Sequence, residues 1–368
     1  MRKKILFILH LPPPVHGSSM VGKYIKESNT INNTFNCRYI NLSTSISVDE
    51  IGKKPILKAI RYILILLKII IELVRFKPKL CYMTITAKGA AFYKDSIAVF
   101  LIKLFGVKIV YHMHNKGVAI NKDKAFDDYL YKRVFNNSQV ILLSQYLYND
   151  IEKYVNIEDV FLCPNGIPEV DYQLENNVEN TESKVRILFL SNLIESKGIY
   201  ILLEACKLLD DRELNFYCDF VGGEADINKT IFEKKVKELN LDNKVKYLGK
   251  QYADDKISTF KNSDIFAFPT FYHNETFGLV NLEAMQYNLP IVSTFEGGIP
   301  DVVEDGVNGF LVKQRDIVDL ANKLEVLIQD KDLRMEMGIA GRKKYEREFT
   351  LDIFEKRLKD ILMKIVYA

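Results

Sequence analysis

The sequence predicts an α/β protein built from two doubly wound, Rossmann-like domains. Apolar runs of strand length alternate with amphipathic stretches of helix length along the chain of 368 residues. This alternation is typical of parallel sheets covered by helices on both faces. At about 150 residues per domain, the length accommodates two domains. An acidic, Asn-rich stretch without apolar periodicity at residues 169–183 marks the boundary between them.

The expected strands form two sets of six, one on each side of this boundary. The first set is Lys4–His10, Cys37–Leu42, Leu80–Ile85, Lys108–His114, Val140–Ser144 and Val160–Cys163. The second set is Val185–Ser191, Phe216–Val221, Val245–Leu248, Ile265–Pro269, Ile291–Thr294 and Phe310–Val312. Amphipathic stretches between the strands, such as Ile199–Leu209 and Thr230–Leu239, predict the covering helices.

These elements predict the domain boundaries. We expect an N-terminal domain at residues 1–168, a linker at 169–183 and a C-terminal domain at 184–349. A final helix at 350–368, with Thr350 as its N-cap, can pack back on the N-terminal domain. Ligands of such sheets bind at the carboxyl ends of the strands, so two facing domains would place a site in the cleft between them.

The composition and the charge exclude several classes of protein. Hydrophobic residues make up 48% of the chain and charged residues 27%, which excludes disordered, collagen-like and coiled-coil proteins. The five cysteines form no C-x-x-C pair, which disfavours a disulfide framework or structural zinc and favours a reducing cytosol. The apolar run at residues 5–9 is too short for a secretory signal. Residues 1–170 hold 24 basic and 13 acidic side chains, and the remainder hold 27 and 35. The basic half therefore suits an anionic partner.

One amphipathic helix, predicted over Ile56–Phe76, is apolar enough to raise the question of a membrane span. Its charged side chains recur at helical spacing and share one face: Lys58, Arg61, Lys68, Glu72 and Arg75. Five charges inside a bilayer would be unfavourable, so a span is rejected. Two interpretations remain open. The helix either covers a sheet and exposes a solvated charged face, or lies in the interface of a membrane.

A first candidate ligand site follows the first expected strand. Residues 17–23 match the G-x-x-x-x-G-K pattern of a phosphate-binding loop, but Tyr24 stands where that loop needs a hydroxyl for magnesium. A nucleoside triphosphate loop is therefore not expected. Gly17 can still open a helix whose N–H groups face an anion. No G-x-G-x-x-G follows the first strand of either domain, which argues against NAD or FAD.

Two histidines lie at the end of the expected strand Lys108–His114. Alternation along a strand places the imidazoles of His112 and His114 on opposite faces. A zinc site would need a third ligand from the three other histidines of the chain, and no metal site is expected. His114 precedes the loop and is therefore better placed than His112 to hydrogen-bond a ligand. The alternative for each of the two histidines is a buried core position in which protein groups supply its hydrogen bonds.

The strongest candidate site follows the strand Ile265–Pro269. A polar loop leads there into a helix expected to begin near Thr276. That helix is apolar almost all round, so Glu283 is expected to be buried, and a buried carboxylate needs a partner. Either a pair of ligand hydroxyls or a Lys or Arg elsewhere in the chain could serve. The unpaired N–H groups of Phe277–Leu279, with Gly278 permitting close approach, suit a diphosphate.

Two further turns are expected at the same edge of the second sheet. Lys197 lies in the turn after Val185–Ser191, where its charge would support a diphosphate. Gly297 and Gly298 follow Ile291–Thr294, where backbone can approach a ligand closely. The single D-x-D, Asp330–Asp332, lies at a polar junction between helices and implies no metal site.

These residues resemble the retaining glycosyltransferases of family 4, which have the two-domain GT-B fold. Glu275 and Glu283 form the E-x7-E pattern of that family within ETFGLVNLEAMQYNLPIVST, followed by EGGIPDVVEDGVNGFLV. The resemblance implies that Glu283 holds the ribose hydroxyls of a nucleotide. It also implies that Glu275 lies near the transferred sugar and that the amides of Phe277–Leu279 contact the donor.

The resemblance carries over to four more positions. Lys197 matches the diphosphate-binding lysine of the family's R-x4-K turn, whereas Asn192 stands in place of its arginine. His114 matches the histidine that the family places near the donor sugar. Gly17 matches one member of a glycine pair, and His16 replaces the other.

The function implied is transfer of a sugar from a nucleoside diphosphate sugar, with retention at the anomeric carbon and without metal or cofactor. The acceptor would be a lipid-linked saccharide in the biosynthesis of capsule, O-antigen or exopolysaccharide. The enzyme would be cytoplasmic, with peripheral contact to the anionic inner face of the membrane, and would bind no nucleic acid. Two alternatives remain: a GT-B nucleotide-sugar epimerase, and a membrane- or nucleic-acid-binding protein that uses the basic half.

Overall fold

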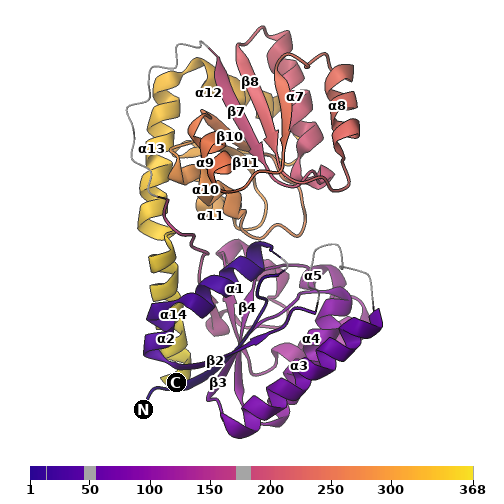
Figure 1. The fold of residues 1–368 in the computed structure, drawn as a ribbon, viewed down its shortest axis with the longest axis vertical. Coiled ribbons are helices and arrows are strands. Elements are labelled where there is room, and N and C mark those ends of the chain that lie inside the picture. Colours follow the sequence, from indigo (N-terminus) through magenta and orange to yellow (C-terminus); the bar gives the residue numbers. More distant parts are fainter. Residues whose placement is uncertain (14, 45–54, 171–183, 368) are drawn as a thin grey trace. The chain divides into compact units, whose positions relative to one another are not determined.

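The computed structural model describes residues 1–13, 15–44, 55–170 and 184–367 (Figure 1). The chain forms two compact units: residues 1–166 and 351–368 make up unit 1, and residues 167–350 make up unit 2. Within the described residues each unit contains one parallel sheet of six strands with flanking helices. The doubly wound α/β fold predicted from the sequence is confirmed. The stretch expected as a linker, 169–183, lies outside the described residues except for Glu169 and Val170.

Unit 1 contains the first set of strands in the order β2-β1-β3-β4-β5-β6. The strands are β1 (Lys4–Leu9), β2 (Asn36–Asn41), β3 (Leu80–Thr84), β4 (Lys108–Met113), β5 (Gln139–Leu142) and β6 (Val160–Leu162). The helices are α1 (Gly17–Glu27), α2 (Asn29–Thr34), α3 (Pro55–Arg75), α4 (Gly89–Leu104), α5 (Val118–Asn121), α6 (Ala125–Phe135), η2 (Gln145–Asp150), η3 (Ile157–Asp159) and α14 (Leu351–Tyr367).

Unit 2 contains the second set in the order β12-β11-β10-β7-β8-β9. The strands are β7 (Val185–Leu190), β8 (Phe216–Val221), β9 (Val245–Gly249), β10 (Ile265–Phe268), β11 (Ile291–Thr294) and β12 (Gly309–Val312). The helices are η4 (Glu195–Lys197), α7 (Ile199–Asp211), α8 (Lys229–Glu238), α9 (Ala253–Lys261), α10 (Leu279–Gln286), α11 (Ile299–Val302), α12 (Ile317–Gln329) and α13 (Lys331–Glu348). The strands of both units lie within two residues of their predicted bounds.

The strand order of unit 2 explains where its loops gather. From β7 the chain runs outward through β8 and β9, and it then returns to the other side of β7 to add β10, β11 and β12. β7 and β10 are therefore neighbours, pairing at Ile187 with Ile265, and their onward connections diverge. A crevice forms at such a switch point of a parallel sheet. In unit 1 the corresponding neighbours are β1 and β3.

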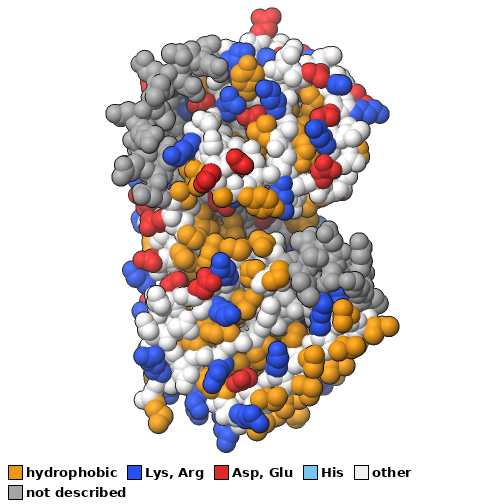
Figure 2. Space-filling view, viewed as in Figure 1, with side chains coloured by type: hydrophobic (Ala, Val, Ile, Leu, Met, Phe, Trp, Pro, Cys, Tyr) orange, Lys and Arg blue, Asp and Glu red, His pale blue; other side chains and the backbone are white. Residues whose placement is uncertain are grey.

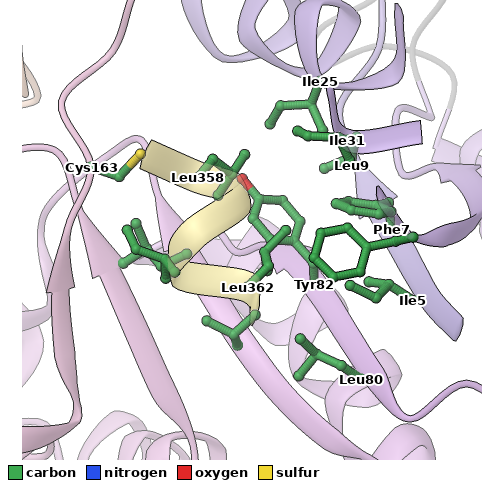
Figure 3. Packing of buried hydrophobic residues seen from close by; sticks show 14 of the residues in the cluster. Ile5, Phe7, Leu9, Ile25, Ile31, Leu80, Tyr82, Cys163, Leu358 and Leu362 are labelled. Atoms are coloured by element: carbon green, nitrogen blue, oxygen red, sulfur yellow. The ribbon is translucent and has the colours of Figure 1, made fainter. Parts of the chain in front are cut away.

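The C-terminal helix α14 completes the core of unit 1. Its apolar side chains, including Leu358 and Leu362, pack against strand residues such as Phe7 and Tyr82 and against Ile25 of α1 (Figure 3). All five of these side chains are fully buried. Sequence periodicity predicted the helix itself, and its burial in unit 1 anchors the end of the chain to the N-terminal sheet.

Helix α3 differs from the expectation of a charged, solvated outer face. Its buried side carries Tyr62, Ile65, Ile69 and Leu73. The opposite side is exposed and apolar, with residues spaced by 3 and 4: Leu57, Ile60, Leu64, Leu67, Ile71 and Val74 (Figure 2). The charged residues of α3 lie between the buried face and the exposed apolar face, because their positions around the helix axis fall on neither face. Within the described ranges, no helix combines the length and apolarity that a bilayer crossing requires.

Candidate functional site

The site in unit 2 is built from the loops that follow β7 and β10. The loop after β7 forms the short turn η4, and Gly198 ends it with a φ of 94° that favours glycine. A Cβ at Gly198 would lie 2.2 Å from the carbonyl oxygen of Pro269 in the other loop. The backbone N–H of Phe271 donates to the carbonyl of Ser196 at 2.8 Å. These close contacts hold the two loops together at the switch point.

The contact between these loops brings Lys197 and Glu275 together. Lys197 Nζ donates to Glu275 Oε2 at 2.5 Å, and the two side chains are only 14% and 12% exposed. The ammonium also lies over the ring of Tyr272, 4.4 Å from its centroid. Two residues that the sequence analysis placed in the catalytic site therefore form one ion pair with a fixed geometry.

The helix after Glu275 begins later than expected, at Leu279 rather than near Thr276. Gly278 has a φ of 67° and serves as its N-cap, and the N–H of Gly278 donates to Glu275 Oε1 at 3.1 Å. The expectation that this amide is unpaired is therefore wrong. The amide of Gly278 is hydrogen-bonded to the carboxylate of Glu275. The amide of Leu279 belongs to the first turn of the helix, where amides have no partner within the helix.

The structure explains why position 297 is a glycine, and the sequence did not suggest this reason. The φ of Gly297 is 56°, and a Cβ there would lie 2.4 Å from the backbone oxygen of Glu275. The N–H of Gly298 donates to the carbonyl of Thr276 at 2.7 Å. This glycine pair supports the loop that carries Glu275, and it is the protein's own backbone that approaches it closely.

Glu283 is not fully buried, so the expectation of its burial is corrected, and a protein cation contacts it. Its side chain is 29% exposed, and Oε1 accepts from Lys256 Nζ of α9 at 2.7 Å. The reason is that Glu283 lies on a side of α10 that faces α9 and solvent, whereas Leu282 and Ala284 enter the core. The sequence left open whether ligand hydroxyls or a Lys or Arg would be the partner of Glu283. A lysine binds one of its two carboxylate oxygens.

The second oxygen of Glu283 belongs to a group of buried polar atoms without a hydrogen-bond partner in the described protein. The others in this segment are Asn274 Oδ1 and both polar atoms of the Asn281 side chain. Asn281 is fully buried. Buried polar groups in proteins are nearly always hydrogen-bonded. Four unpartnered atoms within residues 274–283 are therefore the arrangement expected where a polar ligand supplies the missing bonds.

Asn192 also lies in the loop after β7, but its side chain is already engaged. Its Oδ1 accepts from the backbone N–H of Gly223 at 3.2 Å. A Cβ at Gly223 would lie 3.1 Å from the same oxygen. Asn192 thus ties the loop after β7 to the loop after β8.

In unit 1, Gly17 is the first residue of α1, as expected, and His16 caps the helix. His16 Nδ1 accepts from the N–H of Ser19 at 3.3 Å, and the Ser19 hydroxyl accepts from the N–H of His16. Gly22 lies inside α1, where a Cβ would be 2.1 Å from the carbonyl oxygen of His10. The second glycine of the phosphate-loop pattern therefore serves close helix packing rather than phosphate binding.

His112 and His114 do not lie on opposite faces of the sheet. Their ring centroids are 4.2 Å apart, because β4 ends at Met113 and the chain no longer alternates at His114. His112 is fully buried, and its Nδ1 forms a hydrogen bond with the Tyr82 hydroxyl. At its Nδ1 atom, His112 is therefore the hydrogen-bonded core histidine that the sequence left open as an alternative.

Two more histidines share this part of unit 1. The rings of His10 and His16 are 6.2 Å apart, and His16 lies close enough to His114 for their charges to interact. Burial lowers the pKa of His10 to about 3, with smaller contributions from Lys94, His16 and His114. Burial, with a smaller contribution from His16, lowers the pKa of His114 to about 3. These imidazoles are neutral near pH 7, so they donate and accept hydrogen bonds without adding positive charge.

No group of three or more potential metal ligands occurs among the described residues. Sequence reasoning missed Lys256 and Asn281. The position of Asn281, a polar residue in an apolar helix, was a usable signal. No signal in the sequence pointed to Lys256, because its pairing with Glu283 depends on how α9 packs against α10.

Residues 172–344 match the family model described as Glycosyl transferases group 1. The matched segment includes Lys197 and all residues from Glu275 to Glu283. Residues 172–344, just under half of the chain, are therefore similar to the group 1 glycosyl transferases.

Curated proteins that are similar to this chain match it over part of their length. The capsular polysaccharide biosynthesis glycosyltransferase CapM of Staphylococcus aureus is 31% identical over 207 residues, 55% of this chain and 53% of that protein. A D-inositol 3-phosphate glycosyltransferase of Corynebacterium kroppenstedtii is 34% identical over 157 residues, 41% of this chain and 34% of that protein. The chain thus spans about half, or less, of the length of these relatives.

Solved structures share the fold over almost the whole chain. HepE of Anabaena, in complex with UDP and glucose, matches with a TM-score of 0.71 and 18% identity over 98% of this chain and 100% of that one. Sucrose-phosphate synthase of Thermosynechococcus elongatus matches with a TM-score of 0.75 and 17% identity over 100% of both. The GT-B fold implied by the sequence resemblance is confirmed, and these likenesses speak to the fold alone.

Proposed function

We propose that this protein is a metal-independent, retaining glycosyltransferase of family 4 that uses a nucleoside diphosphate sugar. The observation that carries the proposal is the largely buried pair of Lys197 and Glu275 at the switch point of unit 2, followed in α10 by the unpartnered atoms of Asn281 and Glu283. A cation, two carboxylates and a helix start suit a diphosphate joined to two sugar rings. No cofactor beyond the co-substrate is part of the proposal.

Each of these groups has a chemical task in the proposed reaction. The leaving diphosphate gains negative charge as the glycosidic bond breaks, and Lys197 with the first-turn amides of α10 stabilises that charge. Glu275 holds Lys197 in place and lies beside the reacting sugar. Glu283 accepts from the ribose hydroxyls through the oxygen that Lys256 leaves available. In unit 1, neutral His114 hydrogen-bonds the sugar and Gly17 opens a helix toward the donor.

The acceptor in this proposal is a lipid-linked saccharide used in the biosynthesis of a cell-surface polysaccharide. Its support is the name of the CapM relative and the exposed apolar face of α3 in the basic half of the chain. We therefore place the reaction at the cytoplasmic face of a membrane.

The test begins with a panel of nucleoside diphosphate sugars screened by thermal shift. Release of free nucleoside diphosphate is then measured with each stabilising donor, with and without a lipid-linked saccharide acceptor and with EDTA. We expect acceptor-dependent release that EDTA does not abolish, and a product whose anomeric configuration by NMR equals that of the donor. An epimerase would instead convert the donor without acceptor-dependent release. An inverted product would exclude the retaining mechanism.

A further inference from the structure

A pocket in unit 1 lies at the opposite end of the sheet from His114. Its volume is about 490 Å³. It is lined where β4 and β5 begin, by residues that include Lys108, the first residue of β4, and Ser138, which precedes β5. His114 follows the last residue of β4. The pocket is therefore separate from the carboxyl ends of the strands of unit 1, where His114 lies.

The lining of this pocket is basic. Lys103, Lys108 and Arg133 contribute to it, and no Asp or Glu does. Lys103 Nζ donates to the carbonyl oxygens of Arg133 and Asn136 at 2.8 and 2.6 Å, which fixes one ammonium at the end of α6. Lys108 and Arg133 form no ion pair with a carboxylate of the described residues. Uncompensated cations in a concave site favour an anionic ligand.

The rim of the pocket joins an exposed apolar surface. Phe100 of α4 lines the pocket, and Ile97 and Leu104 share its helical face at spacings of 3 and 4. These three side chains are 38%, 53% and 82% exposed. α4 is tied to α3, because the Tyr62 hydroxyl of α3 bonds to the Lys94 carbonyl of α4. α3 and α4 are therefore neighbours, and their exposed apolar side chains are together called the α3–α4 face.

The charge around the α3–α4 face identifies its partner. Residues 55–108 contain ten Lys and Arg but only Glu72 and Asp95 as acids, and Asp95 is fully buried. A second copy of the chain would bring two such basic surfaces together, which is unfavourable. A nucleic acid would leave the exposed aliphatic side chains in contact with water. An anionic membrane satisfies both features, since its acyl region takes the apolar side chains and its headgroups take the cations.

We propose that unit 1 docks on an anionic membrane through the α3–α4 face and that the basic pocket binds the phosphate of one lipid headgroup. Phe100 lies where both contacts meet, so the pocket fixes the orientation of the docked unit. The docking requires no nucleotide sugar and is independent of the reaction proposed for unit 2.

The test is flotation of the full chain with vesicles of phosphatidylcholine alone and of phosphatidylcholine mixed with phosphatidylglycerol. We expect strong, salt-sensitive binding to the mixed vesicles and weak binding to the neutral ones. The double variant Lys108→Ala, Arg133→Ser should lose about tenfold or more in affinity for the mixed vesicles, since each cation near the surface contributes about 1 kcal/mol. Its binding to neutral vesicles should not change.

Two further variants separate the contributions of the surface. Leu64→Gln with Leu67→Gln should weaken binding to both vesicle types, because both side chains are exposed on α3. Lys207→Ala, at a partly exposed lysine of unit 2, should bind as the wild type does. Wild-type affinity of the pocket double variant for mixed vesicles, in a protein that melts normally, would overturn the headgroup site. Equal binding of the wild type to both vesicle types, or none to either, would overturn the docking itself.

Discussion

Lys197 and Glu275 are 78 positions apart in the sequence, yet their side chains form a largely buried ion pair at 2.5 Å. The pair exists because β7 and β10, which are far apart in the chain, are neighbours in the sheet. A diphosphate bound here would meet a lysine whose position is already fixed. Electrostatic groups arranged in advance need no reorganisation when charge develops.

Replacing Lys197 with alanine should lower kcat by about 10²- to 10³-fold, because a preorganised cation facing the leaving group is lost. Lys197→Arg should retain part of the activity. The measurement is steady-state release of nucleoside diphosphate. Lys207→Ala is the control, since that lysine pairs with Asp211 on the surface of α7. Full activity of a folded Lys197→Ala protein would remove this residue from the site.

Replacing Glu283 with glutamine should weaken binding of the nucleoside diphosphate sugar by about tenfold or more, because hydrogen bonds to a charged acceptor contribute about 1.5–3 kcal/mol. Isothermal titration gives the affinity. Glu325→Gln is a matched control, since Glu325 is 28% exposed and pairs with Arg212, much as Glu283 is 29% exposed and pairs with Lys256. Unchanged donor affinity in Glu283→Gln would leave this carboxylate with only its structural contact to Lys256.

The stability of unit 1 should fall as the pH decreases from 7 to 5. Folding holds the pKa of His10 and that of His114 at about 3, whereas unfolded histidine titrates near 6.5. The unfolded state therefore binds more protons below pH 6.5, and each histidine contributes roughly 1–2 kcal/mol of destabilisation by pH 5. Urea titrations at several pH values measure this slope. His10→Asn should flatten it, whereas His273→Asn, at an exposed position, should not.

Two glycines of α13 should respond oppositely to alanine. A Cβ at Gly338 would lie 1.9 Å from the backbone oxygen of Asn288, whereas at Gly341 the nearest atoms are at 3.6 and 3.7 Å. We expect Gly338→Ala to destabilise unit 2 by about 2 kcal/mol or more through overpacking. Gly341→Ala should stabilise it by up to about 1 kcal/mol through helix propensity. Chemical denaturation gives both values, and changes of the same sign would contradict the packing described for this helix.

The sequence by itself determined the positions of the expected strands along the chain, their division into two doubly wound sheets and the segment that carries the candidate donor site. These features follow from local periodicity and short motifs, since apolar runs and glycine turns act on their own neighbourhood. Lys197 and Glu275 could be assigned to one edge of one sheet for the same reason, because parallel strands align their carboxyl ends.

Only the tertiary structure decided which side chains meet. It paired Glu283 with Lys256, placed the rings of His112 and His114 side by side, and turned an apolar face of α3 outward. Both main faces of α3 are apolar, so periodicity alone could not say which one covers the sheet. The other two outcomes depend on how one helix packs against another and on the residue at which a strand ends, which are properties of the packed chain.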